Sequence, residues 1–173
     1  DWDGLTFSLT PTDTMYITNA EMGEPWMPGE LIPYGDMKIS PAAGVLNYGQ
    51  GLFEGMKAYR TSKDRVVFFR PEENARRMQR GADRLKMPPV PESIFVDAVE
   101  QCVKANLRWL PPMGKGAMYV RPLLMGSGPI LGVAPAPSYR FLVYVTPVGP
   151  YFKGGVKAID LLISDVHHRA APG

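Results

Sequence analysis

Residues 46–59 read LNYGQGLFEGMKAY, which sets three glycines among aromatic and aliphatic side chains. Glycine weakens helices and strands alike, so this density of glycine indicates backbone that must pass close to something else. One interpretation is a tight turn that leads into a core strand. The other is the wall of a ligand pocket in which Tyr48 and Phe53 face the ligand. These residues alone leave both interpretations open.

The composition is that of a globular protein with a substantial core. The chain has 173 residues, of which 45% are hydrophobic, and this length suits one medium domain or one domain with part of another. A net charge of +2 gives no general case for binding nucleic acid or a membrane, and no run is long enough to span a bilayer. Because no signal or transit pattern begins at Asp1, we expect any targeting segment to have been removed or to lie outside this sequence.

The charges are unevenly distributed along the chain. Residues 1–37 hold seven acids and no Lys or Arg, whereas residues 60–86 hold nine basic residues and four acids. Such a basic stretch is either a solvated face or an anion site, for which a phosphate is the best-suited ligand. A basic helix that binds nucleic acid through the four arginines between positions 76 and 84 is a further alternative.

Cysteine and histidine usage limits the available chemistry. The single cysteine, Cys102, excludes an internal disulfide and fits a reducing compartment; it lies on the apolar face of an expected helix, so we expect it to be buried. His167 and His168 have no Cys, His or carboxylate companions at ligand spacing, so no metal site is expected.

Hydrophobic periodicity predicts strands interrupted by two helices. Pro71 opens the first helix, in a position where proline is tolerated, and the second helix covers residues 91–110. The apolar stripe of the first helix consists of Ala75, Met78, Ala82 and Leu85. The expected strands lie at residues 15–17, 30–34, 53–59, 66–70, 117–125, 139–147 and 160–165. This order predicts an α+β (mixed α/β) fold with a largely antiparallel sheet.

Tyr119 and Arg121 share one face of the expected strand at 117–125, because residues two apart point the same way. An arginine on a mostly apolar strand needs a partner, since a buried unpaired charge is expensive. That partner is either an acid of this chain or a substrate carboxylate, which a guanidinium grips with two parallel hydrogen bonds while a phenol adds a third.

Arg76 and Arg77 lie in the first turns of the helix that Pro71 opens. Adjacent helical side chains diverge by about 100°, so at most one of the two faces inward. Arg77 adjoins the apolar stripe at Met78, which makes it the better candidate for binding an anion, although most helix arginines are simply solvated.

Taken together, five segments resemble the branched-chain amino-acid aminotransferases, which are pyridoxal-phosphate enzymes of fold type IV. The segments are LNYGQGLFEGMKAY at 46–59, VVFFRPEENARRMQR at 66–80, AMYVRPLLMGSGPILGV at 117–133, TPVGPYFKGG at 146–155 and HHRAAPG at 167–173. They are collinear across nearly the whole chain. The start PTDTMYI and the ending RAAPG are most similar to plant members. The resemblance implies the small N-terminal domain of such an enzyme.

The resemblance also implies roles for individual residues. It makes Arg77 the arginine that holds the phosphate of pyridoxal 5'-phosphate, and Tyr119 and Arg121 the pair that orients the substrate carboxylate. It makes Tyr48 and Phe53 aromatic residues around the substrate side chain, and Tyr151 the aromatic residue on the interdomain connection. Leu131 and Val133 match loop residues that enter the active site of the neighbouring subunit of a homodimer.

The Schiff-base lysine of the family has no counterpart here. In relatives it follows the segment that matches 168–173, so it would lie beyond Gly173, and no catalytic residue is assigned within the chain. The resemblance divides the chain into a small domain at 1–148, an interdomain connection at 149–159, and the start of a large domain at 160–173. We expect the chain by itself to be inactive.

The activity implied for the parent protein is transfer of an amino group between leucine, isoleucine or valine and 2-oxoglutarate. A D-amino-acid transaminase or an aminodeoxychorismate lyase of the same fold is the alternative. A non-catalytic truncated domain, competent only for packing or dimerisation, is the alternative of another class. The plant-like resemblance favours a plastid (chloroplast), with mitochondrion and cytosol open.

Overall fold

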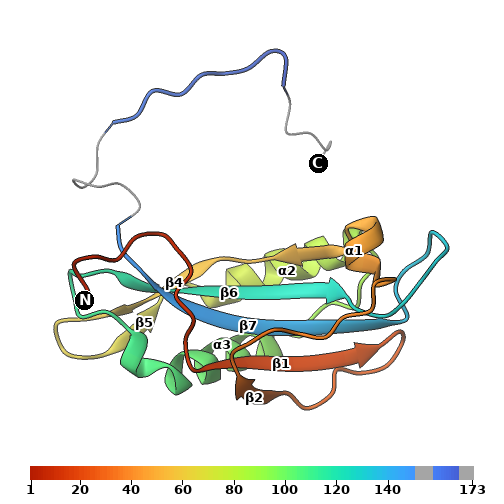
Figure 1. Ribbon diagram of the computed structural model, residues 1–173, viewed down its shortest axis with the longest axis horizontal. Helices are drawn as coiled ribbons and strands as arrows, with labels where there is room; N and C mark the ends of the chain where they lie inside the picture. The colour runs from red at the N-terminus through yellow and green to blue at the C-terminus, as the bar shows by residue number, and fades with distance from the viewer. Residues whose placement is uncertain (151–157, 168–173) are drawn as a thin grey trace.

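The computed structural model describes residues 1–150 and 158–167. Its strands form one antiparallel sheet, and the two long helices pack on one face of it (Figure 1). The strands are β1 (Thr14–Glu21), β2 (Glu30–Pro33), β3 (Gly51–Phe53), β4 (Met56–Arg60), β5 (Val66–Phe68), β6 (Ala117–Gly126) and β7 (Ser138–Val148). The helices are α1 (Gly44–Tyr48), α2 (Pro71–Arg84), α3 (Glu92–Ala105) and the short 3-10 helix η1 (Leu107–Trp109). The strand order is β2-β1-β7-β6-β4-β5, and β3 pairs with the other end of β6.

The hydrophobic core lies between the sheet and the two long helices. Phe95 of α3 stacks on Phe141 of β7, with ring centroids 5.8 Å apart. Cys102 is fully buried on the same helix, and desolvation raises the pKa of its thiol to about 12. The expectation that this cysteine is buried is therefore confirmed, and its protonated thiol gives it no nucleophilic character at neutral pH.

Alternation along β6 separates the two faces of the sheet. Met118, Val120 and Leu124 are buried in the core cluster that includes the helix residues. Tyr119 and Arg121 alternate with these residues and therefore point to the face that the long helices leave open. The predicted orientation of this pair on one face is confirmed.

The expected α+β class, the antiparallel sheet and both long helices are confirmed, but the strand predicted at 53–59 is interrupted. Phe53 ends β3, which pairs with β6, and Met56 begins β4, which pairs with both β5 and β6. Glu54 and Gly55 keep the same register against β6, since the N–H of Glu54 donates to the carbonyl of Pro122 at 2.9 Å. Pro122 has no N–H to return the second bond of the pair, so the ladder is interrupted there.

Three further expectations need correction. The strand predicted at 160–165 is absent: residues 158–167 form neither helix nor strand, and no other described strand lies beside them to pair with. Leu85 is 38% exposed because α2 ends at Arg84 and Leu85 belongs to the turn that follows. The second helix stops at Ala105, because the buried side chain of Asn106 bonds to the carbonyl oxygens of Cys102 and Thr14.

Candidate functional site

Arg121 and Tyr119 form the centre of a polar group on the open face of the sheet. The Nη2 of Arg121 donates to the hydroxyl of Tyr119 at 3.0 Å. The guanidinium also lies over the ring of Phe53 at the end of β3, with its carbon 4.1 Å from the ring centroid. This aromatic face attracts the cation and holds the plane of the guanidinium, so the side chain is oriented without an acid.

No carboxylate within the described residues forms an ion pair with Arg121. Its Nε is moreover buried without a hydrogen-bond partner in that part of the chain. A buried N–H that lacks an acceptor costs free energy, and the remainder of this half-buried guanidinium is the part that an incoming carboxylate can reach. Among the described residues, Arg121 therefore does not pair with an acid of its own chain.

The hydroxyl of Tyr119 is placed by two close neighbours. Phe7 meets its ring edge-on, with centroids 5.3 Å apart. Gly55 lies so close that an added Cβ would stand 2.2 Å from the Tyr119 oxygen, so only glycine fits here. A small hollow of about 120 Å³ adjoins Tyr119 and Arg121 and is also lined by Phe7 and by Thr146 of β7.

Arg77 of α2 projects toward the interruption between β3 and β4. Its Nε and Nη2 donate to the two carboxylate oxygens of Glu54, at 2.6 and 2.5 Å. These hydrogen bonds and the adjacent negative charge raise the pKa of Arg77, so it remains a cation. Arg76 instead bonds to Glu73 and Glu92, both on the helical layer. Both arginines are exposed, Arg77 more than Arg76, so neither is turned into the core and the two differ in their partners.

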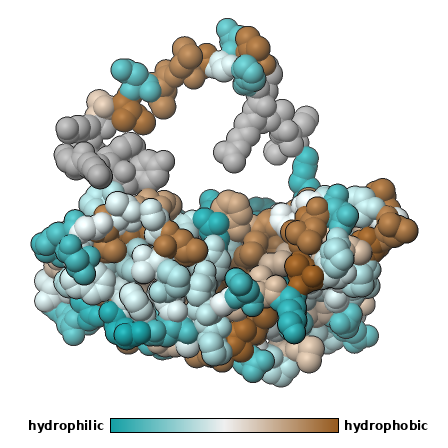
Figure 2. All heavy atoms as spheres, in the orientation of Figure 1, coloured by the Kyte–Doolittle hydropathy of each residue, from teal (hydrophilic) through white to brown (hydrophobic). Residues whose placement is uncertain are grey.

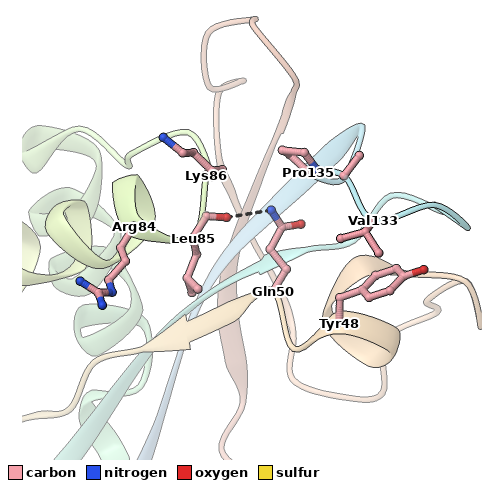
Figure 3. Close-up of a pocket in the computed structure, with 8 residues that line it drawn as sticks. Tyr48, Gln50, Arg84, Leu85, Lys86, Val133 and Pro135 are labelled. Atoms are coloured by element: carbon pink, nitrogen blue, oxygen red, sulfur yellow. Dashed lines mark hydrogen bonds between the residues drawn. The ribbon is translucent and has the colours of Figure 1, made fainter. Parts of the chain in front are cut away.

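Tyr48, Leu131 and Val133 form a second group. The hydroxyl of Tyr48 at the end of α1 donates to the carbonyl of Leu131 in the loop between β6 and β7. Tyr48 and Val133 line a pocket of about 350 Å³ that extends to the C-terminal end of α2. Figure 3 shows Val133 above the Tyr48 ring, and Gln50 reaching across to the Leu85 carbonyl.

Apolar side chains are exposed around this second group. Leu131 and Val133 are 91% and 93% exposed, far more than large apolar side chains usually are. Figure 2 shows apolar side chains gathered over the end of the molecule where α1 and the β6–β7 loop lie. No hydrogen bond or ring contact between described residues joins this group to the Tyr119–Arg121 group.

The structure thus brings Phe53, Tyr119 and Arg121 into one site and places the other residues elsewhere. Tyr151 lies outside the described residues. No group of three or more His, Cys, Asp or Glu within residues 1–150 and 158–167 is arranged to hold a metal ion. No helix in the same part of the chain is long and apolar enough to cross a membrane.

Comparison with known proteins links this arrangement to one enzyme family. No family model matches the chain. The chain is 58% identical over 173 residues to chloroplastic branched-chain amino acid aminotransferase 2 of Humulus lupulus, covering 100% of this chain and 42% of that protein. It is 51% identical over 173 residues to the mitochondrial branched-chain amino acid aminotransferase 1 of the same plant, covering 100% of this chain and 44% of that protein. The chain is a homologue of the branched-chain amino-acid aminotransferases.

The fold agrees with solved aminotransferase structures. The branched-chain aminotransferase of the archaeon Thermoproteus uzoniensis, solved with norvaline, superposes with a TM-score of 0.65 at 24% identity, covering 82% of this chain and 43% of that one. The chain therefore spans less than half the length of the aminotransferases that it matches.

Three residues that contact Tyr119 or Arg77 are absent from the sequence-based candidates. Phe7 is remote in sequence, and nothing in its surroundings signals a role. Gly55 and Glu54 lie within the motif at 46–59, but only the structure reveals that one makes room for Tyr119 and the other holds Arg77. The charge of Glu54 between apolar neighbours is a signal that could have identified it, because a buried carboxylate requires partners.

Arg77 fits the phosphate of the cofactor that this aminotransferase family uses. Its side chain is 65% exposed although Nε and Nη2 are bonded to Glu54. Its Nη1 makes no hydrogen bond to any described residue, so one donor edge remains available to an anion. A guanidinium with a free edge is well suited to phosphate.

Proposed function

We propose that this chain belongs to a pyridoxal-phosphate-dependent transaminase that exchanges the amino group of leucine, isoleucine or valine with 2-oxoglutarate. The observation that carries the proposal is the guanidinium of Arg121, which pairs with no described acid and is held between Tyr119 and Phe53 on the open face of the sheet. All these substrates share a carboxylate, which this group can bind.

In this proposal, Arg121 grips the substrate carboxylate with two N–H donors and the Tyr119 hydroxyl donates a third hydrogen bond. The Phe53 ring keeps the guanidinium plane in place and also presents an apolar surface to a branched aliphatic side chain. Arg77 binds the phosphate of the cofactor through its outer edge. Pyridoxal phosphate, when bound, supplies the electron sink that amino-group transfer requires.

The second group completes the proposal. The exposure of Leu131 and Val133 supports a role outside their own subunit, as the family resemblance implies for a homodimer. We assign Tyr48 and Tyr151 to the surroundings of the substrate side chain on the same basis. We assign no lysine of this chain to the chemistry and propose that the 173 residues alone do not catalyse the transfer. We place the parent protein in a plastid, since a chloroplastic relative is 58% identical, although a mitochondrial one is 51% identical.

A hybrid enzyme tests this proposal. The chain would be joined to the remaining part of the Humulus lupulus chloroplastic aminotransferase, and transamination would be measured with leucine, isoleucine, valine and their 2-oxo acids. Arg121→Lys should lower kcat/KM for amino and 2-oxo acids alike, because an ammonium cannot make the two-pronged contact. Arg140→Lys is the matched control, since Arg140 on β7 bonds to Asn19 and to the Lys38 carbonyl. Unchanged kinetics for Arg121→Lys would remove the residue from the site.

A further inference from the structure

Glu54 is a buried carboxylate at the interruption between β3 and β4. Its side chain is only 4% exposed, whereas its cationic partner Arg77 is 65% exposed. The two oxygens of Glu54 accept hydrogen bonds from Arg77, and the Nδ2 of Asn74 donates a further one at 2.8 Å. The fixed member of the pair is therefore the acid, and the arginine is the side chain that it restrains.

This restraint determines which edge of Arg77 faces outward. A long arginine side chain on a helix surface samples many rotamers unless it is bonded. The two parallel bonds to Glu54 lock the guanidinium in one orientation and occupy the Nε–Nη2 edge, which leaves Nη1 available. Arg76, one position earlier, instead bonds to two half-exposed acids, neither of which is a buried anchor.

The backbone of Glu54 connects this arginine to the carboxylate-binding group. Its N–H bonds to the Pro122 carbonyl, immediately after Arg121 on β6. Its two neighbours contact that group directly: the Phe53 ring lies against Arg121, and Gly55 makes room for the Tyr119 hydroxyl. Three consecutive residues thus link the α2 side of the sheet to its open face.

We propose that Glu54 is a positioning residue. Its carboxylate presents the free edge of Arg77 to the cofactor phosphate, and its backbone fixes the position of Arg77 relative to Arg121. The inference rests on the proposed function, because it requires Arg77 to bind the phosphate. The buried acid does not itself touch substrate or cofactor.

The test uses the 173-residue chain and pyridoxamine 5'-phosphate, a probe that needs no lysine for attachment. Affinity would be measured by calorimetry, with pyridoxamine as the probe that lacks phosphate. The Nε–H signal of Arg77 in nitrogen–proton NMR would report whether the guanidinium is held. Glu54→Gln keeps the size of the side chain but turns an amide N–H toward the donors of Arg77 or Asn74. Glu92→Gln is the matched control, because it removes an arginine–glutamate pair from Arg76 alone.

We expect that Glu54→Gln loses the Nε–H signal of Arg77, because the proton then exchanges with water. Its dissociation constant for pyridoxamine 5'-phosphate should rise at least about tenfold. Glu92→Gln should change neither, and affinity for pyridoxamine should be the same in all three proteins. Should Glu54→Gln fail to fold, Glu54→Asp takes its place: the acid keeps its charge but is one methylene shorter, so both readouts should weaken, and unchanged readouts would overturn the inference.

Three outcomes would overturn the inference, and they differ from one another. Loss of the Arg77 signal with unchanged phosphate affinity would mean that the pair is purely structural. Tighter binding by Glu54→Gln would mean that the acid competes with phosphate for the guanidinium. A wild-type chain that holds Arg77 but does not distinguish pyridoxamine 5'-phosphate from pyridoxamine would refute the phosphate role of Arg77 in the proposed function, and the positioning role with it.

Discussion

Gly55→Ala offers a direct test of how the Tyr119–Arg121 group is built. An alanine Cβ would lie 2.2 Å from the Tyr119 oxygen and 3.0 Å from the ring carbon that bears it. The phenol must therefore move, which strains the site and weakens the 3.0 Å hydrogen bond from Arg121 and the ring contact with Phe7. Overpacking costs about 1–3 kcal/mol, and a hydrogen bond to a charged group is worth about 1.5–3 kcal/mol. Because this bond is weakened and not lost, we expect a loss of about 2–4 kcal/mol in the free energy of unfolding.

A double-mutant cycle separates this effect from a general loss of stability. Tyr119→Phe removes the colliding oxygen, so Gly55→Ala should cost only about 1 kcal/mol in that background, the remainder reflecting the tight ring carbon. Urea unfolding followed by tryptophan fluorescence measures all four proteins. Gly132→Ala is the control, because an added Cβ there meets nothing within 4 Å. An equal penalty for Gly55→Ala in both backgrounds would refute the steric explanation.

Three other measurements address the rest of the chain. Asn106→Leu should lower the free energy of unfolding by about 2–5 kcal/mol, because the buried amide N–H groups donate to Thr14 and Cys102 and its oxygen accepts from the N–H groups of Asp13 and Thr14. An unchanged midpoint of urea unfolding would contradict this. The pKa of the Cys102 thiol is raised to about 12 in the folded chain, so its contribution to stability is complete below its unfolded pKa and falls as pH rises toward 12. Cys102→Ala should flatten that decline, and an unaltered slope in pH-dependent urea titrations would exclude the thiol as its source. Treatment with pyridoxal phosphate and borohydride should label no single lysine preferentially; mass spectrometry that finds one dominant site would argue against an inactive chain.

Local patterns were sufficient for most of the elements. Pro71 marks the start of α2, the alternation from 117 to 125 marks β6, and both depend on chemistry within a few residues. The same period of two predicts that Tyr119 and Arg121 share a face, which holds wherever the strand is placed. The expected strand at 160–165 failed because a strand requires a neighbouring strand, and the sequence of a segment does not supply one.

The sequence by itself determined the elements and the alternation that turns a phenol and a guanidinium to the same side. Only the tertiary structure decided what these side chains meet. Arg121 lies over an aromatic ring and pairs with no acid among the described residues, whereas Arg77 bonds to a buried acid 23 positions away in the sequence. The physical reason is that periodicity is a property of neighbouring residues, while the partner of a charge depends on distances between segments that only the folded sheet brings together.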